Sequence, residues 1–223
     1  MRHEDNLLQA GQDILVVDTC SFRRLAICHC LNAWSGGVTG VSCLEDVPAG
    51  RTRCVGGVVL GLGGTLSDLM RQLRSLAALL SVMPVPVALV TDMSPCCALA
   101  LLTLAGIPSG MSGDIRIIPS GLSAARVRDL LLTALRWKSP LPGVGRYRLP
   151  LSPQHLDVLG GMIAGLDEVT GKPARGADMK TLYSQRYATL RRLRVAGRHA
   201  LLCGRFAHPV SRGRVVSGGG AMS

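Results

Sequence analysis

The chain has 223 residues, of which 48% are hydrophobic and only 3% aromatic, so any core must be aliphatic and the length allows one large or two small domains. The net charge of +11 is concentrated at one end: residues 1–143 carry 12 Lys or Arg and 10 Asp or Glu, whereas residues 144–223 carry 13 and 4. This asymmetry predicts a near-neutral partner domain joined to a module that binds a polyanion. A generally Arg-rich proteome is the alternative cause of the same charge.

The eight cysteines show neither CxxC spacing nor paired histidines, so the sequence predicts free thiols, no metal site and no cofactor. Reduced thiols are typical of the cytosol. The polar N-terminus lacks a signal-peptide pattern, and the longest apolar run, 76–90, is interrupted by Pro84 and Pro86. We therefore expect a cytoplasmic protein that does not enter a membrane.

Strand-like and helix-like segments alternate five times in residues 10–138, which we assign to a first domain. The expected elements, in chain order, are strand 13–18, helix 21–34, a weaker strand near 40–44, strand 57–61, helix 67–80, strand 85–91, helix 95–104, strand 115–118 and helix 123–137. This alternation is typical of an α/β doubly wound parallel sheet.

Residues 139–150 contain three prolines and two glycines and are expected to form an extended linker. The strong segments after the linker are helical, which predicts a small all-α domain at 151–208. The remaining residues, 209–223, are Gly/Ser-rich and basic, and we expect them to be disordered.

Two helices of the second domain have recognisable ends. Ser152 and Pro153 are suited to the first positions of one helix, which we expect to end at Gly165. Asp178 is expected to cap a second helix that continues to Leu193.

The second helix combines an apolar face with a polar one. Leu182, Thr189 and Leu193 can face a core, with Leu190 at its edge. The polar face carries Lys180, Tyr183, Ser184 and Tyr187, flanked by Arg186, Arg191 and Arg192. Tyr and Ser can contact base edges while Lys and Arg bind phosphates, so this helix is predicted to enter the major groove of DNA. An ordinary solvated basic face is the alternative, against which two of the chain's three tyrosines argue.

This domain resembles the LuxR/NarL-type helix-turn-helix. The matching motifs are LSP at 151–153, DVL at 157–159, KTL at 180–182 and RLRV at 192–195. The resemblance implies that Tyr183, Ser184 and Tyr187 face the groove of DNA. The full set of residues expected to contact DNA is Lys180, Thr181, Tyr183, Ser184, Arg186, Tyr187 and Arg191. It also implies a final helix at 198–206 that dimerises the domain. The scaffold helix departs from the family pattern at 169–175, because Gly171 and Pro173 both disfavour helix.

The first domain resembles a CheY-like receiver domain of response regulators. The resemblance begins in ILVVDTCSFRRLAICHCL, where Asp18 matches the first acid of the family's acidic pair but Thr19 replaces the second. Gly61 stands in place of the phosphate-accepting Asp, and Thr91 matches the family's Ser/Thr. The family's Lys is missing from IRIIPSG.

This residue set predicts a pseudo-receiver without phosphotransfer. An acyl phosphate needs a carboxylate nucleophile, and its chemistry needs a divalent cation held by several carboxylates. We expect Asp18 to cap the following helix and Thr91 to form hydrogen bonds at the end of its strand. Asp68 lies on the next helix and is not expected to reach the same pocket.

These patterns together predict a DNA-binding transcription regulator that works without phosphorylation. It is expected to bind double-stranded DNA as a homodimer or as a heterodimer with a homologous regulator. An adaptor that acts through protein contacts, without its own operator, is the alternative. An enzyme such as a cysteine hydrolase is disfavoured because no Cys-His-acid pattern is recognisable.

Overall fold

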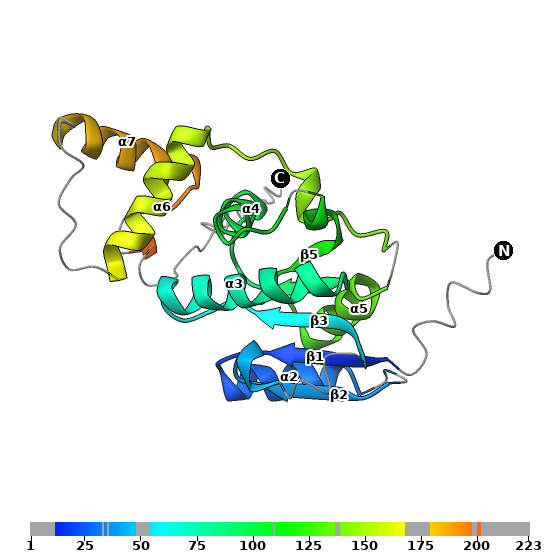
Figure 1. Ribbon diagram of the computed structural model, residues 1–223. Coiled ribbons are helices and arrows are strands. Elements are labelled where there is room, and N and C mark those ends of the chain that lie inside the picture. The colour runs from blue at the N-terminus through cyan, green and yellow to red at the C-terminus, as the bar shows by residue number, and fades with distance from the viewer. Residues whose placement is uncertain are drawn as a thin grey trace, which may run out of the picture.

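A computed structural model gives the conformation of most of the chain (Figure 1). The residues that it describes are 12–32, 34, 36–47, 54–108, 110–136, 139–167, 179–197 and 200–201. The expected scaffold segment at 169–175, the capping residue Asp178 and the tail at 209–223 lie outside these ranges, as does most of the expected helix 198–206.

Five parallel strands form a single sheet in the order β2-β1-β3-β4-β5. The strands are β1 (Asp13–Val17), β2 (Val38–Val41), β3 (Val55–Gly61), β4 (Val87–Val90) and β5 (Ile115–Ile118). Every residue of β3 and β4 is buried, as expected for central strands covered on both faces. This strand order is that of the flavodoxin and CheY type of doubly wound fold, so the predicted fold class of the first domain is confirmed.

Two helices cover each face of the sheet. Helices α3 (Leu66–Val82) and α4 (Pro95–Leu104) pack into one hydrophobic cluster, and α2 (Ser21–Cys30) and α5 (Ala124–Ala134) pack into the other. Capping side chains begin the first pair, since Thr65 accepts a hydrogen bond from the Asp68 amide at 3.2 Å and Ser94 accepts one from the Cys97 amide at 3.2 Å.

Most expected elements occur within a few residues of their predicted bounds. Helix 95–104 and strand 115–118 match the observed elements. The first helix was expected to continue to residue 34 but ends at Cys30. Its last turn closes through the Leu31 amide, and the indole of Trp34 instead donates to the Gln12 carbonyl at 3.0 Å. That contact with the residue before β1 turns the chain away from the helix axis.

The segment 139–150 packs against the first domain around residues 143 and 144, whereas the sequence predicted only an extended linker. It contains the short 3-10 helix η4 (Val144–Arg146), which contacts η3 (Met111–Asp114). Val144 is completely buried, and Gly143 lies so close to the backbone of Gly113 that a side chain would collide with it. We refer to 139–150 as the connecting segment.

Helix α6 (Pro153–Asp167) lies between α7 (Met179–Arg192) and the helices α3 and α4 (Figure 1). Ser152 begins α6 as predicted, because its hydroxyl accepts from the His155 amide at 3.4 Å and its carbonyl accepts from the Leu156 amide at 3.0 Å. The prediction that Gly165 ends this helix is wrong, since α6 continues to Asp167. Glycine is compatible with helical backbone and merely lowers its stability, so packing decides where the helix ends.

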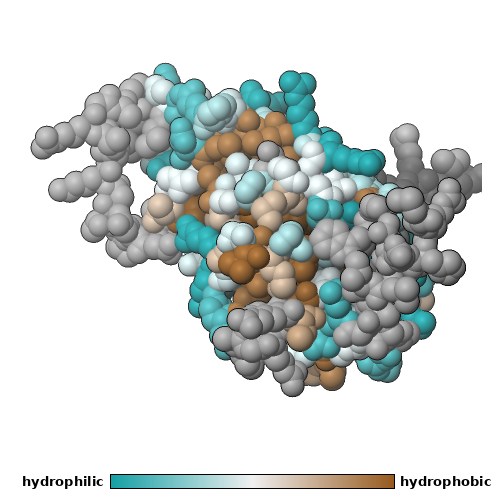
Figure 2. Space-filling view, turned by 45° about the vertical axis from the view of Figure 1, so that its right-hand side comes forward, coloured by the Kyte–Doolittle hydropathy of each residue, from teal (hydrophilic) through white to brown (hydrophobic). Residues whose placement is uncertain are grey.

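The helix pair shares a hydrophobic core with the sheet. Leu159 of α6, Leu190 of α7 and Leu193 belong to the same buried cluster as the residues of α3 and α4. Buried residues on both sides of the connecting segment therefore belong to one cluster. On the surface, Figure 2 shows a band of hydrophobic residues between hydrophilic flanks. Within the described residues, no helix combines the length and hydropathy that a membrane crossing requires.

Candidate nucleic-acid interface and the edge of the sheet

Asp18 and Gly61 meet at the carboxyl edge of the sheet. Asp18 follows β1, and Gly61 is the last residue of β3. These two neighbouring parallel strands pair through Val17 and Leu60. Thr91 comes directly after β4 and therefore lies at the same edge. Asp18, Gly61 and Thr91 are thus gathered where open α/β sheets bind their ligands.

Asp18 forms a buried ion pair with Arg23. The carboxylate is fully buried and accepts from Nη2 of Arg23 at 3.0 Å, while Nε of Arg23 contacts its second oxygen. This bidentate arrangement is the stronger form of charge-assisted hydrogen bond. The hydrogen bonds to Asp18 raise the pKa of Arg23 although burial acts in the opposite direction.

The prediction that Asp18 caps the next helix needs correction. The N-cap of α2 is Cys20, which makes no side-chain capping bond. Asp18 accepts from the Cys20 amide at 2.8 Å, just before the helix begins, and its own carbonyl accepts from Nη1 of Arg24 at 2.6 Å. Both arginines of α2 therefore bind Asp18, Arg23 at the carboxylate and Arg24 at the backbone carbonyl.

Two glycines leave the space that Arg23 occupies. A Cβ atom at position 61 would collide with the carboxylate of Asp18 and lie 3.1 Å from Nε of Arg23. At position 63 it would lie 2.8 Å from Nη2 of Arg23. The Asp18 carboxylate thus lies directly against Gly61, and the guanidinium of Arg23 lies beyond it, next to Gly63. Arg23 neutralises the charge of Asp18.

Thr91 is almost fully buried and its hydroxyl accepts from the Met93 amide at 3.2 Å. It therefore shapes the turn after β4, in agreement with its predicted role as a strand-end hydrogen-bonding residue. Thr19 is exposed and does not line the cavities found at this edge among the described residues.

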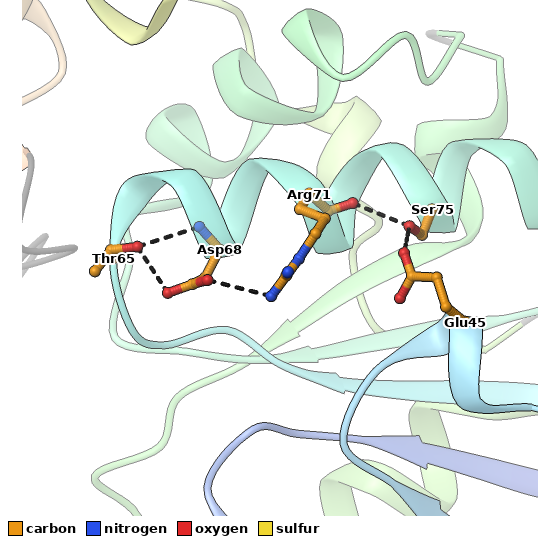
Figure 3. A network of polar contacts seen from close by, with 5 residues as sticks. All are labelled: Glu45, Thr65, Asp68, Arg71 and Ser75. Atoms are coloured by element: carbon orange, nitrogen blue, oxygen red, sulfur yellow. Dashed lines mark hydrogen bonds and ion pairs between the residues drawn. The ribbon is translucent and has the colours of Figure 1, made fainter. Parts of the chain in front are cut away.

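Asp68 belongs to a separate polar network along α3 (Figure 3). Its carboxylate accepts from the Thr65 hydroxyl at 2.7 Å and from Nη2 of Arg71 at 3.2 Å. Further along the helix, Ser75 donates to the Arg71 carbonyl at 3.1 Å and contacts Glu45, whose pKa is lowered mainly by this hydroxyl. Asp68 is thus engaged at the start of α3, away from the Asp18–Arg23 pair, as the sequence predicted.

The described residues include potential metal ligands and free thiols. Among these residues no group of three or more His, Cys, Asp or Glu side chains could hold a metal ion. Burial raises the pKa of Cys97 to about 12, so this thiol stays protonated at neutral pH and is a poor nucleophile.

Helix α7 carries four cationic residues and no acid in its 14 residues. Its exposed side, which we call the α7 polar face, consists of Lys180, Thr181, Tyr183, Ser184, Tyr187 and Arg191. The two tyrosines are 61% and 70% exposed, which is unusual for such large side chains. Arg186 is half-buried at the border of this face.

The opposite side of α7 is anchored. Thr189 is fully buried and donates to the Gln185 carbonyl at 2.8 Å, while Leu190 and Leu193 pack in the core. Arg192 donates to the Pro150 carbonyl at 3.2 Å and so joins α7 to the connecting segment. The side chain of Leu182 lies outside the described set.

Arg194 ends α7 in a left-handed conformation, with φ of 58°. The Val195 amide bonds back to the Leu190 carbonyl at 3.0 Å, the pattern of a Schellman motif. This turn directs the chain back to the core, where Val195 is buried.

The residues that were expected to contact DNA thus lie on one helix, on its exposed polar face except for Arg186 at the border of that face. Sequence reasoning missed Arg23, which no family motif marks. The sequence spacing could have indicated this residue. Arg23 comes five residues after the acid at the end of β1, which places it on the first turn of α2. It also missed the anchoring of α7 to the connecting segment.

Comparison with known proteins gives remote structural likenesses. No protein-family model matches the chain, and no curated protein matches it. A structure of two RcsB dimers bound to two parallel DNAs has a TM-score of 0.46 at 18% identity, covering 86% of this chain and 96% of the other. Full-length FixJ from B. japonicum has a TM-score of 0.35 at 16% identity, covering 86% and 94%. A putative pilus assembly-related protein from Burkholderia pseudomallei has a TM-score of 0.41 at 17% identity, covering 57% and 91%.

Proposed function

We propose that this protein is a DNA-binding transcription regulator of the LuxR/NarL type, with a pseudo-receiver as its first domain. It acts in the cytoplasm and binds double-stranded DNA through α7 in a C-terminal helix-turn-helix. Its role is regulatory and not enzymatic. It works as a homodimer or as a heterodimer with a homologous regulator.

The α7 polar face is the observation that carries this proposal. It combines exposed cations, which suit phosphate oxygens, with exposed Tyr and Ser side chains, which suit base edges. The buried side of the same helix holds it against α6, so the polar face is presented by a packed element and not by a loop. A rigid helix with this composition suits the wide major groove.

The Asp18–Arg23 pair supports a mechanism without phosphorylation. Phosphotransfer at this edge would require a nucleophilic carboxylate at position 61 and a divalent cation beside Asp18. Position 61 is a glycine and offers no nucleophilic carboxylate. The guanidinium of Arg23 occupies the place beside the Asp18 carboxylate where the divalent cation would bind. We expect no phosphoryl adduct by intact-mass measurement after incubation with acetyl phosphate and Mg²⁺.

DNA binding is tested by pairing two substitutions that change the net charge equally. Arg191→Ala removes a cation from the α7 polar face, whereas Arg126→Ala removes an exposed cation from α5. We expect Arg191→Ala to weaken binding to all duplexes by about 3- to 10-fold and to reduce the salt dependence by about one counterion. Fluorescence anisotropy at several salt concentrations measures both quantities.

Equal effects of the two substitutions would mean that only net charge matters and would contradict the assignment of α7. If the unsubstituted chain, tested against its own promoter region and random duplexes, binds neither, the proposal fails in favour of an adaptor.

Sequence recognition is tested at Tyr183. Tyr183→Ala removes a ring that is 61% exposed and makes little contribution to the core. We expect it to reduce discrimination at the contacted base pair by on the order of 1 kcal/mol, while non-specific affinity stays within about 2-fold. Selection of preferred sites from a randomised duplex library by the two proteins measures this change, and identical selected sites would contradict it.

A further inference from the structure

A cavity of about 300 Å³ lies between the carboxyl edge of the sheet and the connecting segment. One wall comes from the first domain and includes Ile117 of β5 and Leu130 of α5. The other wall comes from the connecting segment and includes Leu141 and Tyr147. The volume is at the lower end of the range for small-molecule sites, roughly 300–1,000 Å³.

The lining is apolar except for a few groups at the turn after β4. Asp92 supplies the single charged side chain among the lining residues. Its side chain is exposed and has no hydrogen bond or ion pair among the described residues. Thr91 and Tyr147 add a hydroxyl each, and the phenol ring adds an aromatic surface.

A second cavity of about 200 Å³ adjoins the first, because both are lined by Thr91, Asp92 and Met93. Arg23 lines this second cavity, but its guanidinium is already bound to Asp18. The pKa of Arg23 is raised by its hydrogen bonds to Asp18 and, as a weaker effect, by the charge of Asp92 across this cavity. The Asp92 carboxylate oxygens form no hydrogen bond or ion pair among the described residues and can bind a ligand at the junction of the two cavities.

We propose that this site binds a small organic cation, an amine or quaternary ammonium carried on a hydrocarbon or aromatic body. The ammonium group would pair with Asp92, and the body would contact Ile117, Leu130 and Leu141. The ring of Tyr147 would add a cation–π contact to the ammonium group. A neutral ligand would leave the Asp92 carboxylate without a partner, and an anion would be repelled by it.

The connecting segment gives such a ligand a route to α7. Beyond the cavity wall at Tyr147, the Arg148 carbonyl accepts from the Cys96 thiol of α4 at 3.8 Å, and the Pro150 carbonyl accepts from Arg192 of α7 at 3.2 Å. A ligand that holds Leu141 and Tyr147 therefore acts on a segment that is bonded to the DNA-binding helix. This effect of the ligand on α7 rests on the proposed function. Coupling between two binding sites is reciprocal, so DNA would change the affinity for the ammonium ligand by the same factor.

The site is tested with the full chain in the absence of DNA. Phenethylammonium is the probe and 2-phenylethanol is its uncharged counterpart, both titrated by calorimetry. We expect the ammonium to bind at least 10-fold more tightly than the alcohol. Asp92→Asn should remove this preference, whereas Asp129→Asn, which neutralises an exposed acid of α5 outside the cavity, should preserve it.

A second variant keeps the test independent of charge. Leu130→Phe adds volume to a half-buried lining residue and should abolish binding of both probes, while circular dichroism checks that the fold is retained. Absence of ammonium binding to the unsubstituted chain, or binding that survives both Asp92→Asn and Leu130→Phe, would overturn the proposal.

The coupling is measured separately, by repeating the DNA titration of the unsubstituted chain with saturating phenethylammonium. We expect a change in DNA affinity of at least 3-fold, absent in Asp92→Asn. Ligand binding without this change would overturn the coupling, while absence of DNA binding in all samples would instead contradict the proposed function.

Discussion

The carboxyl edge of the sheet and the α7 polar face are both rich in polar side chains, but they differ in what those side chains contact. At the sheet edge, Asp18 is fully buried and its charge is neutralised by Arg23. On α7, Tyr183 and Tyr187 point into solvent beside exposed cations. Polar groups that are already paired inside the protein have little capacity to bind a ligand, so the comparison favours α7 as the functional surface.

The sheet edge combines a receiver-like strand order with a buried ion pair. The strand order and the position of Asp18 are those expected for a receiver-like fold. The glycine at position 61 leaves space for the Asp18 carboxylate, which an arginine of the next helix neutralises. The edge thereby becomes a stabilising contact between β1, β3 and α2.

The largest effect is expected for Gly61→Asp, which would place a second carboxylate against Asp18. The new side chain would collide with the buried pair, and two acids would compete for Arg23. We expect a loss of on the order of 4 kcal/mol in the free energy of unfolding and no gain of phosphorylation. Urea denaturation measures the loss.

The matched control for this change is Gly121→Asp, where a side chain would enter open space. It should alter stability by less than about 0.5 kcal/mol. If Gly61→Asp is tolerated as well as the control, the sheet edge is not filled as described and the comparison with α7 fails.

Leu159→Ala tests whether the helix pair and the sheet share one core. Leu159 is completely buried in α6, and its truncation should cost about 3 kcal/mol. Both tryptophans of the chain, Trp34 and Trp137, precede the connecting segment, so their fluorescence reports on the first domain. We expect the fluorescence midpoint in urea to fall together with the circular dichroism midpoint.

A fluorescence transition that stays unchanged while helical signal is lost earlier would show that α6 and α7 unfold independently. Leu122→Ala is the control, because this leucine is exposed and its truncation should change both midpoints little.

Arg23→Ala should cost about 2–3 kcal/mol, because it leaves the Asp18 carboxylate buried with only part of its hydrogen bonding. The side chain of Arg23 is 30% exposed, so water offsets part of the loss. The double variant Asp18→Asn with Arg23→Ala should be less destabilised than Arg23→Ala alone, since it removes the unpaired charge. Additive losses in this double-mutant cycle would contradict a specific pairing of the two side chains.

The smallest effect is expected for Gly161→Ala on α6. This glycine is exposed, and a Cβ atom there would meet nothing within 4 Å. Alanine should therefore stabilise the helix by about 0.5–1 kcal/mol through backbone entropy. A thermal melt measures the gain, and a lower melting temperature would indicate that the α6 surface at this position is covered by another part of the protein.

The sequence alone predicted the elements whose signals are local. Alternation of apolar runs and amphipathic segments located the strands and helices of the sheet, and Ser152 with Pro153 located the start of α6. The missing acid at position 61 and the polar face at Tyr183 and Tyr187 were also visible, because identity and helical spacing are properties of the chain itself.

Tertiary structure decided the features that depend on distant partners. The pairing of Arg23 with Asp18 requires the space left by Gly61, which comes from another strand. The connecting segment packs because Val144 finds a place in the core beside η3, and α6 passes Gly165 because its buried side is stabilised by α3, α4 and α7. Short-range preferences determine which elements form, whereas burial and charge pairing between remote residues determine how they assemble and which side chains remain exposed to bind a partner.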